Sequence, residues 1–403
     1  MRLDVDWIRA QFPLLAANPG LHYLDSAASA QVPASVIDAV QRFDTESRAN
    51  VHRGVHRLAE RATDAYEGAR RTLARFLSAH PREIVFTGGC TAAINLVAQG
   101  YGALLLPGDE VVISELEHHS NIVPWQMLRD RRGIVLKTLP VGEDGRLDMA
   151  ALERVVTKRC RLIALTHCSN VTGAVSDIGS IVDAAGTVGA KVLLDGAQRA
   201  PHGPIDLPEL GVDFYAIAGH KMFGPTGIGV LWGREEALAR MQPMLGGGGM
   251  IEQVRIERTT YADPPQRFEA GTPPIAGAVG LGAAAEWQEQ QDWPALTQNA
   301  LRLTGRMLDG LAGIEGTRII GPTGLQGRIG IVSFALEGAH PHDVCQVLDA
   351  RSVACRGGHH CTQPLHDRFG LAGSTRASLG PYSDDAAIDA LIEGVAEARR
   401  IFA

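Results

Sequence analysis

The stretch DFYAIAGHKMFGPTGIGVLWG, residues 213–233, contains two short apolar runs, 213–219 and 227–233, separated by a glycine-containing turn. Apolar residues in both runs are nearly continuous rather than alternating, which is typical of strands covered on both faces. Helical patterns such as AAINLVAQGYGALL and GSIVDAAGTVGA lie between runs of this kind, and the alternation predicts βαβ units with a mainly parallel sheet. The four earlier runs are EIVFTG (83–88), DEVVIS (109–114), RLIALTH (161–167) and AKVLLDG (190–196).

The pattern changes from about Trp287 onward. A helical stretch at 293–314 precedes a strand-like run at 330–336 and a helical run at 343–350. The chain closes with a helical pattern at 383–402, for which Ser383 is a suitable N-cap because acidic residues follow it in the first turn. These elements predict a second, smaller α+β domain.

We therefore predict an α/β protein in three parts. Residues 1–20 form a helical segment that packs with the small domain. Residues 21–290 form a large domain whose mainly parallel, mixed sheet is flanked by helices, and residues 291–403 form the small C-terminal domain. The length of 403 residues is suitable for two domains of ordinary size.

The composition predicts a folded protein with small-molecule or protein partners. Its formal net charge of -7 gives no overall basic character for binding nucleic acid. No apolar run approaches the roughly 18 residues of a membrane-spanning helix, and the start, MRLDVDWIRAQFP, lacks the apolar core of a signal peptide. The six cysteines include no CxxC pair, which favours reduced thiols and predicts a cytoplasmic location.

Residues just after the predicted strands are the first site candidates, because open α/β sheets bind ligands there. The turn GCTAAIN enters a helix, so its backbone amides and the hydroxyl of Thr91 are suited to a phosphate. A glycine turn before a helix is, however, usually only a turn. The strand KVLLD ends on Asp195, which is either an N-cap or the partner of a protonated ring nitrogen.

Lys221 directly follows the strand DFYAIAG, with His220 before it and small residues around it. A lysine in a turn is usually a surface residue, but in an apolar pocket its pKa falls and it becomes a Schiff-base nucleophile. After the strand DEVVIS, the imidazole of His118 is suited to lie flat over an aromatic cofactor. His118 and His119 are a poor metal pair, because consecutive side chains rarely point at one ion.

These four features together are what pyridoxal 5′-phosphate requires. The cofactor needs a lysine for its Schiff base, an acidic partner for its ring nitrogen, a phosphate cup and a group that stacks on its ring. All four follow predicted strands. The sequence therefore predicts a pyridoxal-phosphate protein, with no metal site.

The loop RGGHHCTQP, residues 356–364, raises the question of what Cys361 does. A buried structural thiol is the usual role of a cysteine, but this loop is polar and rich in glycine and histidine. A zinc site normally uses spaced ligand pairs, which are missing here. As a nucleophile, Cys361 has nearby cationic candidates in Arg356, His359 and His360 that would favour its thiolate.

Nine motifs, in order along the chain, carry a family resemblance. The chain resembles the class V, fold-type I pyridoxal-phosphate enzymes and, within them, the type II cysteine desulfurases of the SufS kind. The resemblance covers nearly the whole chain and implies the fold of the pyridoxal-phosphate-dependent transferases. The motifs are YLDSAASAQVP (23–33), VHRGVHRLA (51–59), EHHSNIVPWQ (117–126), THCSNVTG (166–173), DGAQ (195–198), GHKMFGPTGIG (219–229), RFEAGTP (267–273), RGGHHC (356–361) and TRASLG (375–380).

The resemblance implies roles at the cofactor ring and at the substrate. Lys221 forms the Schiff base, Asp195 pairs with the ring nitrogen, His118 stacks on the ring and Gln198 touches the phenolic oxygen. The residues implied to hold or approach the substrate are Asn170, Arg356, His359 and Arg376.

The resemblance also implies a phosphate site shared between two subunits of a homodimer. Thr91 and His220 hold the phosphate, and Thr272 reaches in from the second subunit. The position of Cys90 belongs to this cup, although the family usually has threonine there, and Ala218 replaces a serine. Bonds to a charged group contribute about 1.5–3 kcal/mol each, so we expect weaker retention of the cofactor.

The implied reaction converts L-cysteine to L-alanine, with Lys221 as the base and Cys361 taking the sulfur as a persulfide. The persulfide would supply iron–sulfur cluster assembly or other sulfur-compound biosynthesis. A selenocysteine lyase or a cysteine or cystine β-lyase on the same fold is an alternative, as is a cofactor-binding regulatory protein that catalyses nothing.

The segment HPHDV, residues 340–344, bears on the sulfur acceptor. It resembles desulfurases that serve a zinc-containing SufU-like acceptor rather than a SufE-like one. His342 would then approach the zinc of the partner. The alternative is a loop that only caps a helix.

Overall fold

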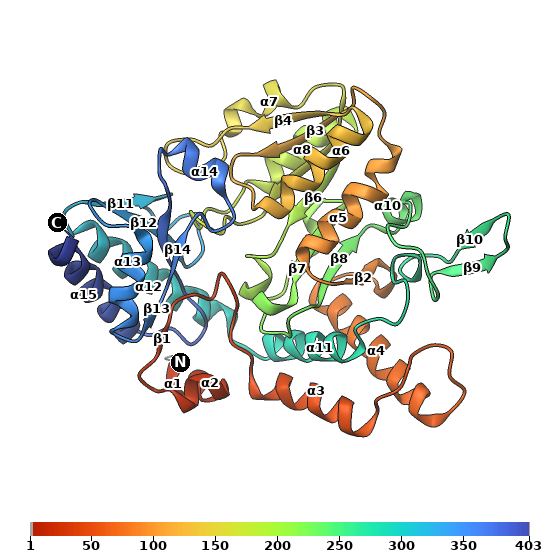
Figure 1. Ribbon diagram of the computed structural model, residues 1–403, viewed down its shortest axis with the longest axis horizontal. Coiled ribbons are helices and arrows are strands. Elements are labelled where there is room, and N and C mark those ends of the chain that lie inside the picture. Colours follow the sequence, from red (N-terminus) through yellow and green to blue (C-terminus); the bar gives the residue numbers. More distant parts are fainter. Residues whose placement is uncertain (1–2, 403) are drawn as a thin grey trace.

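Seven strands form the central sheet of the larger domain in this computed structural model, which describes residues 3–402 (Figure 1). Strand β8 is antiparallel to both of its neighbours, and the other pairs are parallel. The sheet is therefore mixed but mainly parallel, as predicted. In spatial order the strands are β2 (Ile84–Thr87), β8 (Gly229–Gly233), β7 (Phe214–Ala218), β6 (Lys191–Asp195), β5 (Cys160–Thr166), β3 (Glu110–Ser114) and β4 (Val135–Leu139).

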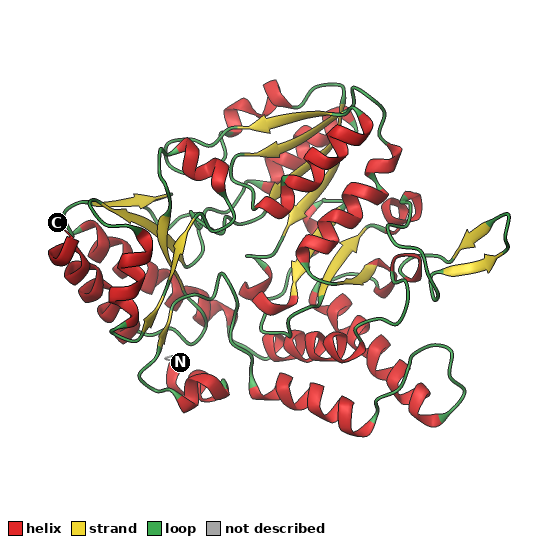
Figure 2. Ribbon diagram, viewed as in Figure 1, coloured by secondary structure: helices red, strands yellow, loops and turns green. Residues whose placement is uncertain are grey.

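Helices cover both faces of this sheet (Figure 2), which explains its nearly continuous apolar strands. Neighbouring residues of β5 illustrate the arrangement, since Leu162 packs into one core with α5 and α6 and Ile163 into the other with α4, α8 and α11. The helices of the large domain are α3 (Ala34–Glu46), α4 (Arg57–Phe76), α5 (Cys90–Gly100), α6 (Val123–Arg132), α7 (Leu152–Val155), α8 (Ile178–Val188), α9 (Leu207–Leu210), α10 (Glu235–Arg240) and α11 (Ile275–Glu289).

Short 3₁₀ helices and one hairpin complete the large domain. The hairpin of β9 (Ile251–Val254) and β10 (Thr259–Tyr261) projects outward at the right of Figure 1. The 3₁₀ helices are η1 (Pro81–Glu83), η2 (Gly102–Leu104), η3 (His119–Asn121), η4 (Met149–Ala151), η5 (Ala200–His202), η6 (Gly219–Lys221) and η7 (Gln266–Phe268).

The small domain consists of a four-stranded antiparallel sheet with helices against it. Its core contains Phe334 from the sheet, Leu303 from the first helix and Leu391 from the last. The strands, in order, are β11 (Thr317–Ile320), β12 (Ile331–Leu336), β15 (Ser374–Ser378) and β14 (Arg356–Gly358). The helices are α12 (Trp293–Ala312), α13 (Pro341–Asp349), α14 (Gln363–Arg368) and α15 (Asp385–Phe402).

The N-terminal segment joins both domains. Helices α1 (Val5–Ala10) and α2 (Pro13–Ala17) supply Phe12 to a cluster with Trp287 and Tyr382, and β1 (His22–Tyr23) pairs in parallel with β13 (Val353–Ala354). Strand β1 therefore hydrogen-bonds to the small domain, although it lies two residues after the predicted boundary at residue 20.

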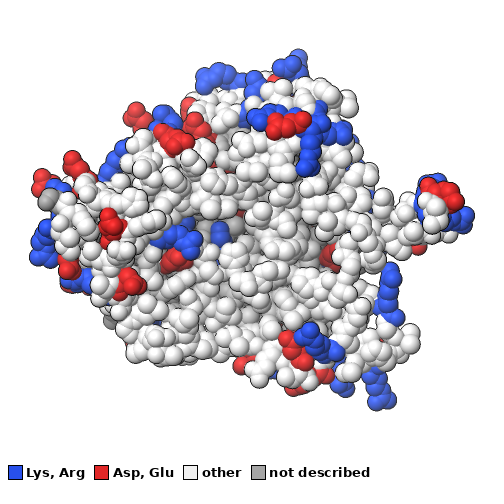
Figure 3. Space-filling view, viewed as in Figure 1, with Lys and Arg blue, Asp and Glu red and all other residues white. Residues whose placement is uncertain are grey.

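Charged side chains of both signs lie mainly around the rim of the face shown in Figure 3, and the middle of this face is largely uncharged. No helix within residues 3–402 combines the length and the apolar character that crossing a membrane requires.

Candidate active site

A cavity of about 250 Å³ lies at the carboxyl ends of β5, β6 and β7, where the loops after these strands meet the small domain. We call it the active-site cavity. Its lining includes most of the predicted site residues: Cys90, Thr91, His118, Asn170, Asp195, Gln198, His220, Lys221, Arg356, Cys361 and Arg376. Residues from both domains therefore meet in one space, as the ligand rule for open α/β sheets predicts.

Asp195 ends β6 and is 5% exposed. Its Oδ1 accepts hydrogen bonds from the backbone N–H of Ala197 at 2.9 Å and from the thiol of Cys90 at 3.2 Å. A buried carboxylate is costly unless it is bonded, and these two donors support one of its oxygens. Oδ2 remains available for a cationic ring nitrogen.

Lys221 lies in η6, directly after β7, and is half-buried at the wall of the cavity. The turn is tight, since a Cβ atom on Gly219 would lie 2.8 Å from the carbonyl oxygen of Ile228. Burial lowers the pKa of Lys221, while the nearby Asp195 acts in the opposite direction. A lysine whose ammonium form is destabilised is suited to attack a carbonyl carbon.

His118 follows β3 and lines the same cavity. Its Nδ1 accepts the backbone N–H of Ser120 at 3.1 Å and lies 2.8 Å from the hydroxyl of that residue. Burial, followed by the charge of Lys221, lowers the pKa of His118 to about 4. The ring is therefore neutral near pH 7, flat and fixed in orientation.

The amino-terminal end of α5 lies at the active-site cavity, where the sequence predicts a phosphate cup. Gly89 has a φ of 131° and open space where a Cβ atom would point, and Thr91 and His220 also line the cavity. The prediction placed Cys90 in the cup, but its thiol bonds Asp195 instead. Ala218 ends β7 beside these residues and has no side-chain donor.

Gln198 and Asn170 already have partners within the protein. The amide nitrogen of Gln198 donates to the carbonyl of Ala27 at 2.8 Å, which leaves its second N–H free. Asn170 donates to the carbonyl of His360 at 2.7 Å and accepts from the hydroxyl of Thr362 at 3.1 Å. Asn170 therefore fixes the loop that carries Cys361, a role that the sequence did not indicate.

Arg376 is 2% exposed and lies on β15, next to the cavity. It donates to the backbone carbonyl of Asn170 at 3.0 Å and to Oδ1 of Asp25 at 3.2 Å, and its Nε has no partner within residues 3–402. The other oxygen of Asp25 accepts from Nε of Arg356 at 3.2 Å. Asp25, which is not among the predicted site residues, thus orients both guanidinium groups predicted to bind substrate.

Cys361 is an exposed free thiol at the edge of the cavity. It and His360 have φ values of 57° and 51°, a left-handed conformation that costs about 1–2 kcal/mol per residue. The carbonyl of Cys361 accepts the backbone N–H of His119 at 2.7 Å, and the ring of His119 accepts the N–H of Gln363 at 3.1 Å. Bonds to the large domain therefore hold this tight turn in place.

The expectation that His360 favours a thiolate through its charge is wrong. Its ring is buried, with Nε2 3.0 Å from the carbonyl oxygen of Ser374. Burial, reinforced by Arg376, lowers the pKa of His360 to about 2, so it is neutral. His359 is half-buried outside the lining residues, with its ring 5.5 Å from that of His366.

Besides His359, two predicted residues lie outside the active-site cavity. Thr272 borders two other cavities, one of which also contains His52 and Glu269, and is absent from the lining of the active-site cavity. His342 is exposed near the start of α13, and a Cβ atom on Gly358 would lie 3.9 Å from its Nε2.

The donor set fits pyridoxal 5′-phosphate. The cavity presents an amine with a lowered pKa on Lys221, a buried carboxylate with one free oxygen on Asp195, a neutral flat ring on His118 and a helix N-terminus at Gly89. An aldehyde, a protonated ring nitrogen, an aromatic face and a phosphate would each meet a suitable group.

Comparisons with known proteins agree with this chemistry. A family model described as "Aminotransferase class-V" matches residues 22–391. A "Probable cysteine desulfurase" of Streptomyces coelicolor is 45% identical over 99% of this chain and 98% of its own length. A "Cysteine desulfurase" of Dickeya dadantii is 46% identical over 98% of this chain and 97% of its own.

A solved structure shares the whole fold. The crystal structure of the cysteine desulfurase CsdA from Escherichia coli, in its S-sulfonic acid form, matches with a TM-score of 0.92 and 39% identity and covers 100% of both chains. The chain therefore belongs to the class-V aminotransferase family of pyridoxal-phosphate enzymes and, within it, to the cysteine desulfurases.

Proposed function

We propose that this enzyme transfers the sulfur of L-cysteine to Cys361 and releases L-alanine. The main support for this proposal is that three groups line one cavity. They are the exposed thiol of Cys361, the amine of Lys221 with its lowered pKa and the buried guanidinium of Arg376. The reaction balances without another reactant, because the Cβ–S bond of L-cysteine breaks, an S–S bond to Cys361 forms and the thiol protons are redistributed to carbon and to the persulfide.

Arg376 and Asn170 bind the substrate carboxylate in this proposal. Arg376 is buried, and its Nε has no hydrogen-bond partner among residues 3–402. Its link to Asp25 fixes the guanidinium plane before substrate arrives, so a carboxylate meets an oriented donor. The second N–H of the Asn170 amide is free to join it, because the first binds the carbonyl of His360.

Lys221 moves the proton on Cα. Burial favours its neutral form, which accepts a proton from the carbon. When bound, the cofactor stabilises the electron pair left on that carbon. Asp195 would pair its carboxylate with the ring nitrogen of the bound cofactor, and the neutral ring of His118 would stack on the cofactor ring.

Cys361 attacks the substrate sulfur as a thiolate. Its left-handed backbone and the bonds to Asn170 and His119 present the thiol at the rim of the cavity, where a persulfide remains accessible. Arg356 lines the same cavity and supplies positive charge. Since His360 is neutral, charge stabilisation of the thiolate rests on the arginine side chains.

The test is alanine release from L-cysteine by cofactor-loaded enzyme, with intact mass measured before and after reduction. We expect alanine and one reducible added sulfur in wild type, and neither in Cys361→Ser with its cofactor spectrum unchanged. Cys345→Ser is the matched control, because Cys345 lies on α13 outside the cavity. Pyruvate, or sulfur release without Cys361, would instead identify a β-lyase.

We propose further that the enzyme is a homodimer with shared active sites. Thr272 lies in an exposed segment away from the active-site cavity of its own chain, so it is available to reach a second copy. Mixing Lys221→Ala with Thr272→Ala subunits tests this. A hybrid would contain one intact site and regain activity, whereas sites built within one chain would gain nothing from mixing.

We also propose that a SufU-like zinc protein accepts the persulfide sulfur for iron–sulfur cluster or other sulfur-compound biosynthesis in the cytoplasm. His342 is exposed beside the strand that leads into the Cys361 loop, and all six cysteines are free thiols, as suits a reducing compartment. His342→Ala should lose stimulation by a purified acceptor of this type while retaining basal activity. Gln346→Ala, one turn along α13 and also exposed, is the control.

A further inference from the structure

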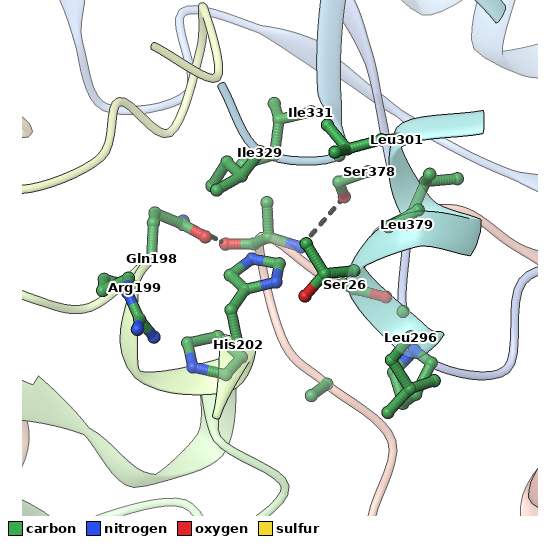
Figure 4. A pocket seen from close by; sticks show the side chains of 18 of the residues that line it. Ser26, Gln198, Arg199, His202, Leu296, Leu301, Ile329, Ile331, Ser378 and Leu379 are labelled. Atoms are coloured by element: carbon green, nitrogen blue, oxygen red, sulfur yellow. Dashed lines mark hydrogen bonds between the residues drawn. The ribbon is translucent and has the colours of Figure 1, made fainter. Parts of the chain in front are cut away.

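A second cavity, of about 240 Å³, lies at the junction of the two domains (Figure 4). We call it the interdomain cavity. It shares Ala27, Gln198 and Lys221 with the active-site cavity, so these three residues border both spaces. In Figure 4, Gln198 and His202 lie on one side and Leu296 and Leu379 on the other. Nothing in the proposed reaction uses this space.

Most of the wall is apolar. Phe223 comes from the large domain, Trp293 and Leu301 from α12, and Ile329 and Ile331 from the segment before and into β12. Such a wall favours a ligand with a hydrocarbon body, because binding removes apolar surface of both the ligand and the wall from water.

The polar groups of the cavity are positive or neutral. Arg328 is 6% exposed and donates to the carbonyls of Pro322 and Ile331, but its buried Nε has no partner in the described part of the chain. Arg199 likewise donates only to backbone carbonyls, those of Gly203 and Pro204. Burial lowers the pKa of Arg328 to about 10, which leaves it charged near pH 7.

No counter-ion is supplied by the wall. Among the described residues that line the interdomain cavity there is no aspartate or glutamate, and neither arginine takes part in an ion pair within residues 3–402. His202 is neutral near pH 7, because burial and the charge of Arg199 lower its pKa to about 4. A buried guanidinium without an anion is costly, and an entering anion would relieve that cost.

We propose that the interdomain cavity binds a small organic monocarboxylate with an apolar body and no amino group. The arginines select the carboxylate, the aliphatic and aromatic wall selects the body, and the lack of an acidic lining residue rejects an ammonium group. This specificity excludes L-cysteine and L-alanine, so the site differs from the substrate site. A ligand in this cavity would contact Gln198 and Lys221, which also line the active-site cavity.

Hexanoate and hexylamine, which differ in the sign of their charge, are the probes for this proposal. Isothermal titration of the cofactor-loaded enzyme should show saturable binding of one hexanoate per chain, and at least tenfold weaker binding of hexylamine. Equal binding of the two probes, or no saturable binding of hexanoate, would overturn the proposal. The measurement needs no turnover, so it stands apart from the test of desulfurase activity.

Two tryptophan variants on α12 locate the binding site. Thr297 is exposed and borders the cavity, so Thr297→Trp should fill its mouth and weaken hexanoate binding at least tenfold. Gln298→Trp, the neighbouring exposed position that does not line the cavity, should leave binding unchanged. If Thr297→Trp binds hexanoate normally while Arg376→Ala does not, the probe occupies the active-site cavity and the proposal is wrong.

Arg328→Met tests the charge itself and should weaken hexanoate binding at least tenfold. Arg328 also bonds two backbone carbonyls, so circular dichroism and cofactor content must match wild type for this variant to count. The comparison of probes and the Thr297→Trp variant decide the proposal even if Arg328→Met does not fold.

Discussion

The thiol of Cys90 lies 3.2 Å from Oδ1 of Asp195 and donates a hydrogen bond to it. Burial, together with the charge of Asp195, raises the pKa of this thiol well above its ordinary value, so it remains a protonated donor. The N–H of Ala197 binds the same oxygen. Cys90 is therefore a positioning residue that holds Asp195 with its other oxygen free for the cofactor.

Removing the Cys90 thiol should weaken cofactor binding. A hydrogen bond contributes about 1 kcal/mol, so Cys90→Ala should raise the Kd of the apoenzyme for pyridoxal 5′-phosphate by about fivefold. Cys90→Ser keeps a donor and should bind nearly as tightly as wild type. Quenching of tryptophan fluorescence measures the Kd, and equal affinity of the two variants would show that the bond to Asp195 does not matter.

Loss of the Thr362 hydroxyl should loosen the Cys361 loop. Thr362→Val removes the 3.1 Å bond to Asn170 while keeping the shape of the side chain, so we expect about fivefold faster amide exchange at residues 359–363. Thr317→Val is the control, because the buried Thr317 hydroxyl has no hydrogen-bond partner among the residues that the structure describes. Hydrogen exchange followed by mass spectrometry measures both variants. Unchanged exchange at residues 359–363 in Thr362→Val would mean that the other hydrogen bonds of the loop are enough to hold it.

Asp25→Ala should destabilise the enzyme more than the loss of an exposed ion pair does. Arg376 is almost fully buried and would lose its carboxylate partner, a change that costs about 3–5 kcal/mol. Asp389, which pairs with Arg306 at 2.6 Å, is half exposed, and its removal should cost less than about 1 kcal/mol. Urea midpoints of the holoenzymes compare the two variants, and equal shifts would contradict the structural role of Asp25.

Glu117 is a fully buried carboxyl group directly before His118 in the chain. Its oxygens accept from the hydroxyl of Ser114 at 2.5 Å and from the amide of Asn121 at 2.7 Å. Burial raises the pKa of Glu117 from 4.5 to about 8, against the effect of these bonds. The group is therefore largely protonated at neutral pH in the folded protein and ionised in the unfolded chain.

The pH dependence of stability follows from this difference. Because the folded state binds the extra proton, the contribution of Glu117 is fully present below pH 4.5 and is lost as pH rises to about 8, at about 1.4 kcal/mol per pH unit. Glu117→Gln should remove this loss, so the stability of the variant relative to wild type should increase as pH rises. Thermal unfolding at several pH values, with the exposed Glu60→Gln as control, measures it. If the difference in stability between Glu117→Gln and wild type were the same at every pH, the raised pKa of Glu117 would be refuted.

The central strands and the residues at their ends were predictable because burial on both faces leaves continuous apolar runs. Strand β4 was missed, since Val135 and Thr138 are exposed and interrupt such a run. The last helix was predicted, but its first turn is capped by Asp384, which accepts the N–H of Ala387, and Ser383 binds Gly380 instead. Neighbouring polar residues compete for a cap, and propensity does not separate them.

Contacts made by distant segments were not predictable from local pattern. Asp25 stands in an ordinary turn, and its importance arises only because Arg356 and Arg376, more than 300 residues away, fold against it. The prediction that His360 is charged was wrong for a similar reason. The ring is neutral because it is buried against Ser374. A sequence names the titratable residue, but the surrounding fold sets its ionisation.

The parallel pairing of β1 with β13 has a consequence for synthesis of the chain. His22 is paired with Val353, which the ribosome adds 331 residues later. At about 5–20 residues per second, the early strand waits roughly 15 to 65 seconds for its partner. The large sheet can be completed on the ribosome, whereas the small domain and the arginine site that Asp25 orients can form only after nearly all of the chain has emerged.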